Sequence, residues 1–300
     1  MTPDRRPPIR MPFGTHPPGA LLRAAISVAA TLVAGPVEAI VGPLQAPVLD
    51  VEFVDAEAYA FTDDDRAFIT EVATTTLAEV AEMLPTLPDH VELTVQAGDA
   101  VIPETGDGGS ALAPGRIAWT VDPGRAGGVE AIVRARLRPT LYHELHHLAR
   151  GWTIQGGTVG TRIIDAAVSE GMATAFERDA AGVEPPWAVY PDDVDGWVDE
   201  LRSAGGFAEY AKWMFEHPDG RRWIGYRAGT YVADLAMAAS NRSAAELVST
   251  PTDEVLELAG LTPPVPAPRG AMTTTRTTGG AECGRPAARR SITTTSLPRP

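Results

Sequence analysis

The sequence predicts an α+β fold with a small N-terminal β-sheet, a central helix bearing a His/Glu motif, and a helical C-terminal half. Three observations support it. Apolar and polar residues alternate over Val48–Val54, as on a half-buried strand. Two further segments, His90–Val95 and Ile117–Val121, are also predicted strands. From residue 129 onward the predicted elements are mostly helices.

Local signals define the elements of the N-terminal half. Thr62 is suited to cap a helix that runs to about Leu84, because the acidic run Asp63–Asp65 then occupies its first turn. The glycine-rich segment Gly106–Gly109 is predicted to be a loop. It lacks the lysine and the strand–helix setting of a phosphate-binding loop, so we assign it no chemistry. The segment after Val121 closes the third strand.

The helices of the C-terminal half begin with Val129–Arg150, which Gly151 ends. Pro139 lies inside this stretch, so the helix that carries the motif is predicted to start there, with the proline in its first turn. The remaining predicted helices are 161–181, 194–202, 207–215, 223–239 and 244–261.

Charge divides the chain into three parts. Its formal net charge is −14, but residues 1–40 carry +2 and residues 262–300 carry +5, which leaves −21 on residues 41–261. We therefore predict a leader over 1–40, one folded domain over 41–261 and a disordered Pro/Thr/Arg-rich tail over 262–300. The acidic domain disfavours nucleic acid and anionic membranes as partners.

The apolar run at residues 24–35 is too short to span a bilayer, although it suits the core of a signal peptide. The small-residue cleavage site after it is poor, and a disordered leader or a packed N-terminal helix are the alternatives. A cytoplasmic location is therefore favoured, with secretion through this segment as the second hypothesis. The sequence does not indicate an oligomeric state.

The residues that indicate chemistry are His143-Glu144-Leu145-His146-His147. Positions i and i+4 of a helix share one face, so His143 and His147 can bind one Zn²⁺, and Glu144 can act on a metal-activated water. The only cysteine, Cys283, lies in the tail, so the other ligands must be His, Asp or Glu. His146 is predicted to be structural.

The third ligand is predicted to be a downstream carboxylate. Arg150 and Thr153 stand where the longer metzincin motif has Gly and His. Glu170 is the preferred ligand, since Gly171 beside it permits close helix approach. Glu177 is the fallback, with a solvated surface residue as its alternative interpretation. Partners proposed for a ligand imidazole are Asp165, Ser169 and Tyr142.

The segments Tyr142–Leu148 and Ser169–Ala173 resemble a bacterial family of predicted zinc-dependent proteases and, more generally, the gluzincins. The resemblance covers about residues 115–245. It implies a zincin-like metallopeptidase that binds one Zn²⁺ through His143, His147 and Glu170, with Glu144 as general base and acid and a peptide or protein as substrate. A missing Gly-x-Met-x-Asn element favours an endopeptidase.

A further segment, Trp223–Tyr231, is similar to a Gly-Tyr-x-x-Gly helix of that family. Tyr226 is the candidate oxyanion donor, with Tyr231 and Arg227 in reserve. Alternatively, Gly225 and Gly229 provide close helix packing and the tyrosines only border the core.

The third predicted strand, Ile117–Val121, is a candidate edge strand that would pair with an extended peptide. Two alternatives to an active hydrolase remain: a non-catalytic zincin-fold binding or regulatory module, and a purely helical domain in which the motif is a coincidence. The apolar face formed by Leu141, Leu145 and Leu148 would pack in each case.

Overall fold

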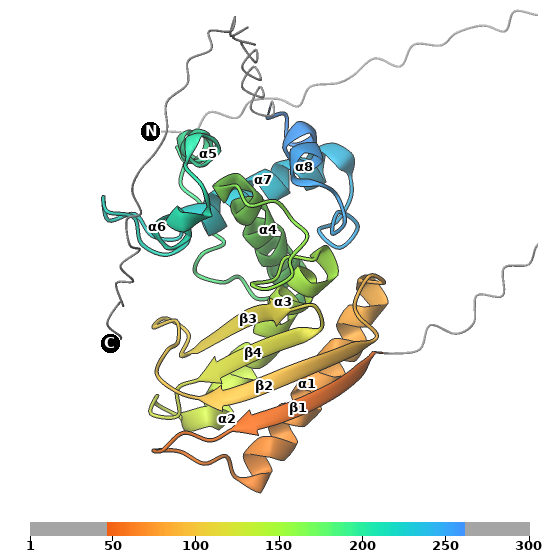
Figure 1. Ribbon diagram of the computed structural model, residues 1–300, viewed down its shortest axis with the longest axis vertical. Helices are drawn as coiled ribbons and strands as arrows, with labels where there is room; N and C mark the ends of the chain where they lie inside the picture. The colour runs from red at the N-terminus through yellow and green to blue at the C-terminus, as the bar shows by residue number, and fades with distance from the viewer. Residues whose placement is uncertain (1–46, 262–300) are drawn as a thin grey trace, which may run out of the picture. The chain divides into compact units, whose positions relative to one another are not determined.

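Four strands form a mixed β-sheet in the computed structural model, which describes residues 47–261 (Figure 1). Their order is β1-β2-β4-β3, so β1 and β3 are the edges. β2 pairs in parallel with both β1 and β4, whereas β3 is antiparallel to β4. The bounds are β1 (Val48–Val54), β2 (His90–Ala97), β3 (Asp107–Ala113) and β4 (Arg116–Val121).

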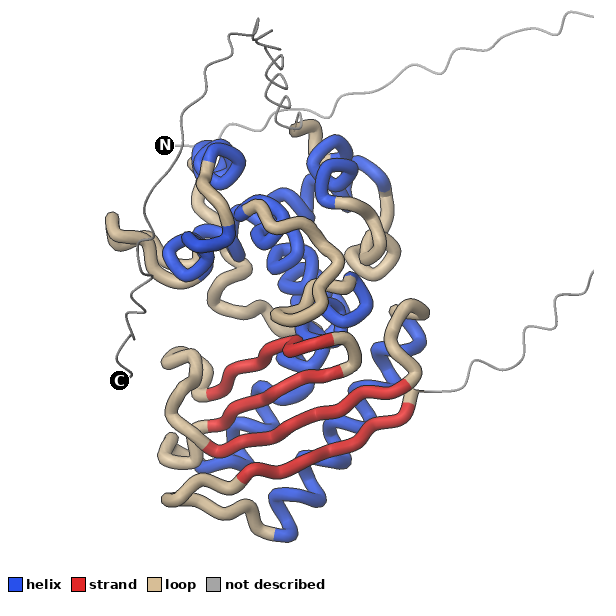
Figure 2. The backbone as a smooth tube through the Cα atoms, viewed as in Figure 1, coloured by secondary structure: helices blue, strands red, loops and turns tan. Residues whose placement is uncertain are grey.

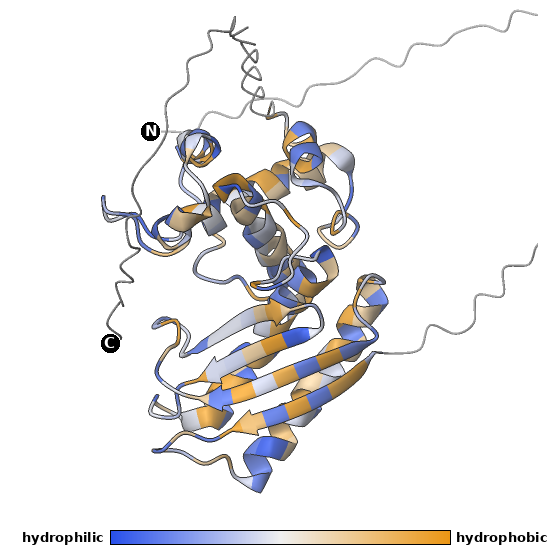
Figure 3. Ribbon diagram, viewed as in Figure 1, coloured by the Kyte–Doolittle hydropathy of each residue, from blue (hydrophilic) through white to orange (hydrophobic). Residues whose placement is uncertain are grey.

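Alternation of side chains explains why three of these strands could be predicted. Val91, Leu93 and Val95 of β2 are buried, and the residues between them are more exposed. The same alternation is visible along β1 and β2 in Figure 3. The first and second strands are therefore confirmed, as is the existence of β4. The predictions for residues 1–40, including segment 24–35, and for 262–300 concern parts of the chain outside the described range.

Helix α1 (Asp63–Met83) connects β1 with β2 and packs on α3 at one face of the sheet (Figure 1). Its cap is the one predicted. The Thr62 hydroxyl accepts a hydrogen bond from the Asp65 backbone at 3.1 Å, and the Asp65 carboxylate accepts one from the Thr62 backbone at 3.0 Å. This reciprocal pair satisfies two of the backbone donors that a helix start leaves free.

Strand β3 corrects two predictions. Residues 107–109 are not a loop but the start of this strand, which the sequence hides because Gly108 and Gly109 show no alternation. Pairing with β4 holds β3, and so does the Asp107 carboxylate, which accepts hydrogen bonds from Trp119 at 3.0 Å and Thr140 at 2.7 Å. Consequently β4 lies inside the sheet, and the edge strand beside the motif helix is β3.

The helical half begins with α2 (Gly128–Ile132), which continues through the π-helical segment Val133–Leu137 into α3 (Arg138–Arg150). Pro139 lies in the first turn of α3, as predicted. Gly151 ends the helix with φ 75°, a left-handed conformation that glycine adopts without steric cost. Nearly every residue of α3 is buried, because the helix lies between the sheet and the rest of the helical half.

Helix α4 (Ile163–Phe176) continues into the π-helical segment Glu177–Ala181 and packs closely on α7 (Ile224–Ser240) (Figure 1). A Cβ atom on Gly171 would lie 1.8 Å from the carbonyl carbon of Gly229, so neither position admits a side chain without displacing the other helix. The close approach expected at Gly171 exists, and α7 is the helix it admits.

Shorter helices complete the described part of the chain: α5 (Val194–Ser203), the 3₁₀ turn Phe207–Glu209, α6 (Tyr210–Met214) and α8 (Thr252–Leu258) (Figure 2). The helix predicted over 244–261 is reduced to α8, because Pro251 cannot continue a helix from the residues before it. Within residues 47–261 no helix has the length and apolar character needed to cross a membrane.

Candidate metal centre

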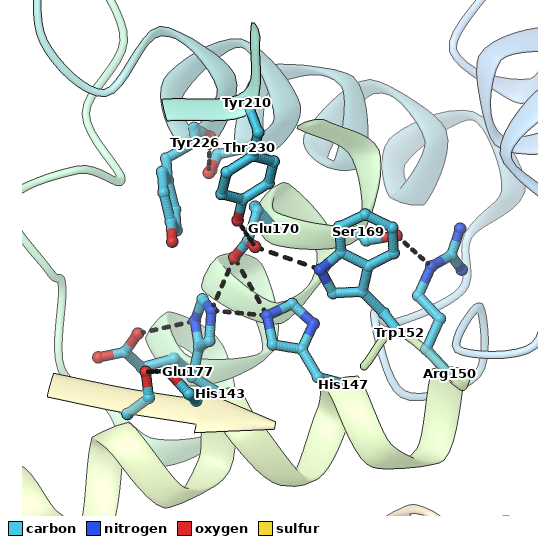
Figure 4. Close-up of polar contacts among 12 residues, drawn as sticks. His143, His147, Arg150, Trp152, Ser169, Glu170, Glu177, Tyr210, Tyr226 and Thr230 are labelled. Carbon is cyan, nitrogen blue, oxygen red and sulfur yellow. Dashed lines mark hydrogen bonds and ion pairs between the residues drawn. The ribbon is translucent and has the colours of Figure 1, made fainter. Parts of the chain in front are cut away.

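Three side chains bring their donor atoms together on the faces where α3 and α4 meet (Figure 4). His143 Nε2 and His147 Nε2 are 3.0 Å apart. Glu170 Oε2 lies 3.2 Å from the first nitrogen and 3.1 Å from the second. All three residues are buried, with at most 7% of each exposed. The two histidines and the preferred carboxylate of the sequence analysis therefore form one compact cluster.

The helices explain this convergence. His143 and His147 are one turn apart and so project from the same face of α3. Glu170 is in the middle of α4, which is buried along its whole length and crosses over that face. A site built on two rigid helices holds its side chains more precisely than one built on loops.

The donor set fits a zinc ion. Two imidazole nitrogens and one carboxylate oxygen are the composition of many catalytic zinc sites, which keep a fourth position open. At zinc–ligand distances of 2.0–2.2 Å, tetrahedral ligand atoms are about 3.3–3.6 Å apart. The 3.0–3.2 Å observed here needs an expansion of only a few tenths of an ångström.

The cluster couples opposite charges in a buried setting. Burial alone lowers the pKa of His143, but contacts with Glu170 and Glu177 outweigh it and raise that pKa to about 10. Burial likewise raises the pKa of Glu170, and the charges and hydrogen bonds of His147 and His143 reverse the effect, so its pKa lies well below the usual range. Because a metal ligand must be a neutral imidazole, a cation that bound here would have to replace the proton on His143.

Glu144 lies beside the cluster and faces the sheet edge. Its carboxylate accepts a hydrogen bond from the Ala111 backbone of β3, and a Cβ atom on Gly109 would lie only 2.6 Å from its Oε1 atom. Gly109 therefore makes room for this carboxylate. Burial raises the pKa of Glu144, against the opposing charges of His143 and His147, which suits a group that must gain and lose a proton.

Glu177, the fallback ligand, is outside the cluster. Its Oε2 atom lies 3.4 Å from Nδ1 of His143, on the opposite side of the ring from Glu170. Its Oε1 atom forms an ion pair with Arg136 at 3.2 Å. Only 1% of Glu177 is exposed, so it is not the solvated residue of the alternative interpretation. This residue is placed to orient a ligand imidazole, a role the sequence analysis gave to others.

The three predicted imidazole partners have different contacts. Tyr142 donates to Glu79, Asp165 caps α4 and pairs with Arg162, and Ser169 accepts a hydrogen bond from Arg150. His146 points away from the cluster, where its Nε2 atom lies 3.4 Å from the Ala244 carbonyl oxygen. Burial holds the His146 pKa well below its usual range, so this ring is neutral, in agreement with a structural role.

Tyrosines and a tryptophan surround the carboxylate of Glu170. Tyr210 donates to its Oε1 atom at 2.8 Å, and Trp152 donates to the same atom at 3.2 Å. Tyr226 points toward the cluster, with its ring 6.2 Å from that of His143 (Figure 4). Burial, followed by the charge of Glu170, raises the Tyr226 pKa well above its usual value, so the phenol keeps its proton.

The reserves for Tyr226 are placed differently. Tyr231 donates to Asp195 at 2.8 Å and contacts the ring of Tyr190. Neither Tyr231 nor Arg227 lines the small cleft beside Glu144. Tyr210 and Trp152 were not among the residues predicted from the sequence. Trp152 follows directly after the end of α3, a position that could have drawn attention to it, whereas nothing in the sequence around Tyr210 indicates its contact.

The cleft beside Glu144 is narrow, with about 40 Å³ of free volume between β3 and the helical half. A larger cavity of about 530 Å³ lies next to Arg150 and the start of α8. None of His143, His147 or Glu170 lines that larger cavity, whereas His143 and Glu144 line the narrow cleft.

The buried His–His–Glu cluster is a donor set that could hold a metal ion. Residues 69–257 match the family described as predicted Zn-dependent protease (DUF2268), and the chain belongs to that family. The match includes α3, α4 and α7, and so every residue of the cluster. Neither the curated proteins nor the solved structures yielded a match.

Proposed function

We propose that this protein is a zinc-dependent endopeptidase with a zincin-like fold. The observation that carries the proposal is the convergence of His143, His147 and Glu170 within 3.2 Å, with the buried Glu144 beside both that cluster and edge strand β3. The family description supports zinc and proteolysis. The order of motif helix followed by a glutamate on the next helix supports the gluzincin type.

Zn²⁺ held by the three ligands would lower the pKa of a water and polarise the scissile carbonyl. Glu144 supplies the proton transfers. Its carboxylate accepts a proton from the attacking water and donates it to the nitrogen of the leaving amine. Its raised pKa, caused by burial, brings proton uptake and release closer to neutral pH than an exposed glutamate allows.

Edge strand β3 provides main-chain groups for an extended substrate. At one end of its outer edge, the carbonyls of Ala111 and Leu112 already accept hydrogen bonds from residues 154 and 155, and at the other the Asp107 carbonyl accepts one from residue 102. Gly109 lies between these ends, next to Glu144. A peptide that adds a strand there would bring a carbonyl close to the metal centre, and β3 replaces 117–121 in this role.

Tyr226 is the proposed donor to the oxyanion. Its phenol is protonated and directed toward the cluster, on the side of the ligands opposite α3 (Figure 4). Tyr210 serves a different purpose, because its hydroxyl is committed to Glu170. Removal of one oxyanion donor in other enzymes costs about 10²–10³ in kcat.

The decisive test replaces Glu144 with Gln in the full chain. Glu144→Gln is expected to keep one zinc per chain and to lose about 10²–10⁴ in turnover, the usual contribution of general acid–base catalysis. Zinc is measured by elemental mass spectrometry, and cleavage on an unstructured protein substrate by mass spectrometry of the fragments. Normal turnover in the variant would refute the mechanism, and a zinc-loaded wild type without hydrolysis would favour the non-catalytic module.

A further inference from the structure

A series of contacting aromatic rings, the aromatic wall, extends outward from the cleft, which three of its members, Trp187, Trp223 and Tyr226, line. It consists of Trp187, Phe207, Tyr210, Phe215, Trp223 and Tyr226. Their rings contact one another in sequence, with centroid distances of 4.9 Å for Phe207–Tyr210, 6.0 Å for Tyr210–Phe215, 5.9 Å for Phe215–Trp223 and 5.4 Å for Trp223–Trp187. The wall therefore forms one continuous surface, although its members come from three separate parts of the chain, at residue 187 and within 207–215 and 223–226.

The wall adjoins the metal centre directly. Tyr210 donates to Glu170, Tyr226 lies beside His143, and Trp187 and Trp223 line the narrow cleft. The other side of that cleft is made by Ile102 and by Gly108 and Gly109 of β3. A chain bound along the β3 edge would consequently present its side chains to aromatic rings.

The outer part of the wall is exposed to solvent. Phe207 and Phe215 are each 45% exposed, and among residues 47–261 they are the phenylalanines with the greatest exposure. Ile154, 70% exposed, lies at the end of the β3 edge, where its backbone bonds to Ala111. The two phenylalanines continue the ring contacts of the wall outward from the cleft. Exposed apolar groups that adjoin one another, instead of being scattered singly, are typical of a binding surface.

Two features indicate that the wall is built for a ligand and not only for packing. Trp223, at the start of α7, has φ 60°, a left-handed conformation that is costly for a bulky residue, and strained residues of this kind cluster at functional sites. Trp187 is 6% exposed, and its indole N–H has no hydrogen-bond partner among the described residues. A buried donor without a partner beside a cleft is available to a substrate carbonyl.

Charged groups in the same cleft are already paired. Arg136 contacts Asp107 at 3.5 Å and Glu177 at 3.2 Å, so none of the three is free to recognise a charged side chain. At the rim, Arg222 pairs with Glu104 at 2.5 Å. Aromatic contact is the interaction that this side of the cleft still offers.

We propose that the aromatic wall selects substrates with an aromatic or large aliphatic side chain next to the scissile bond. This inference rests on the proposed peptidase function, because it assigns the substrate class of the same cleft. Phe215 is the chief determinant to test, since its ring joins Tyr210 to Trp223 at the solvent-exposed side of the wall.

The experiment compares two peptides that differ only at the residues flanking one bond, Phe-Leu in one and Ser-Asn in the other. The wild type is expected to cleave the first about 10–200-fold more efficiently in kcat/KM, the range that apolar pockets achieve. Phe215→Ser should reduce this preference at least fivefold, mainly through KM. Val54→Ser is the matched control, because Val54 is 43% exposed on β1 at the far edge of the sheet.

Binding to the inactive Glu144→Gln variant separates this inference from the proposed function. Zinc-loaded Glu144→Gln should bind the Phe-Leu peptide more tightly than the Ser-Asn peptide, measured by calorimetry, and Phe215→Ser in that background should remove the difference. Preferential binding without hydrolysis in the wild type would support the wall and overturn the peptidase proposal. Hydrolysis of both peptides at equal rates would support a peptidase and overturn the wall.

Discussion

Two buried carboxylates on one helical run approach the same imidazole from opposite sides. Glu170, in the α-helical part, is 3.2 Å from Nε2 of His143, whereas Glu177, where the π-helical segment begins, is 3.4 Å from Nδ1. Residue type and burial are the same, so they cannot explain the difference. The two residues differ in their position along the helical run and in the side chains that contact them. Arg136 forms an ion pair with Glu177, whereas Tyr210 and Trp152 donate hydrogen bonds to Glu170.

This contrast teaches that a ligand is defined by the atom its carboxylate faces. Glu170 points to the two nitrogens that also face each other, so it completes a donor set. Glu177 lies near the other ring nitrogen of His143, which cannot reach the same ion, and we propose that it orients this ring. The two glutamates should therefore respond differently to substitution.

The largest effect on zinc binding is expected at Glu170. Glu170→Ala removes one of the three proposed zinc ligands, so zinc affinity should fall by more than the roughly 100-fold that loss of an outer partner costs. Zinc per chain after dialysis against a chelator buffer is the measurement. Glu246→Ala is the control, because Glu246 is an exposed cap for residue 243. Full zinc retention in Glu170→Ala would mean that the third ligand is another group.

A smaller effect on zinc binding is expected at Glu177. Glu177→Gln keeps the shape of the side chain but removes the charge that orients His143, so zinc affinity should fall about 10–100-fold without loss of the site. Competition with a zinc-binding dye gives the affinity. Because the substitution also leaves Arg136 with one carboxylate fewer, thermal unfolding of the metal-free protein is measured alongside. If Glu177→Gln loses zinc as completely as Glu170→Ala, the two glutamates are not distinguished.

Part of the site could be predicted from the sequence alone, and part could not. Helical periodicity places His143 and His147 on one face, and this spacing alone predicts the pair. Strand β3 escaped prediction because Gly108 and Gly109 carry no pattern, although its edge supports Glu144. Pairing with β4, a contact between segments and not a local preference, creates it.

Contacts between distant segments also decide the surroundings of the cluster. Tyr210 is 40 residues from Glu170, and Arg136 is 41 residues from Glu177. A sequence offers no spacing rule for such contacts. The prediction that preferred Glu170 to Glu177 as the third ligand therefore could not include the fact that both carboxylates approach the same ring. Asp165 was predicted to be a partner of a ligand imidazole, but a local contact prevents this. Its carboxylate accepts a hydrogen bond from the Arg162 backbone at the start of α4.

The smallest effect on zinc binding is expected at Trp152, a neutral residue that donates a hydrogen bond to Glu170. Trp152→Phe removes the indole N–H that donates to Glu170 Oε1 at 3.2 Å but keeps an aromatic ring against Phe207. Tyr210 still donates to the same oxygen, so the loss should be about 1 kcal/mol, a fall in zinc affinity of about fivefold. Trp197→Phe in α5 is the control, because that ring packs under Arg221 away from the cluster. If zinc affinity falls as far in Trp152→Phe as in Glu177→Gln, the hydrogen bonds to Glu170 matter as much as the contact that orients His143, and the expected order of the two effects is wrong.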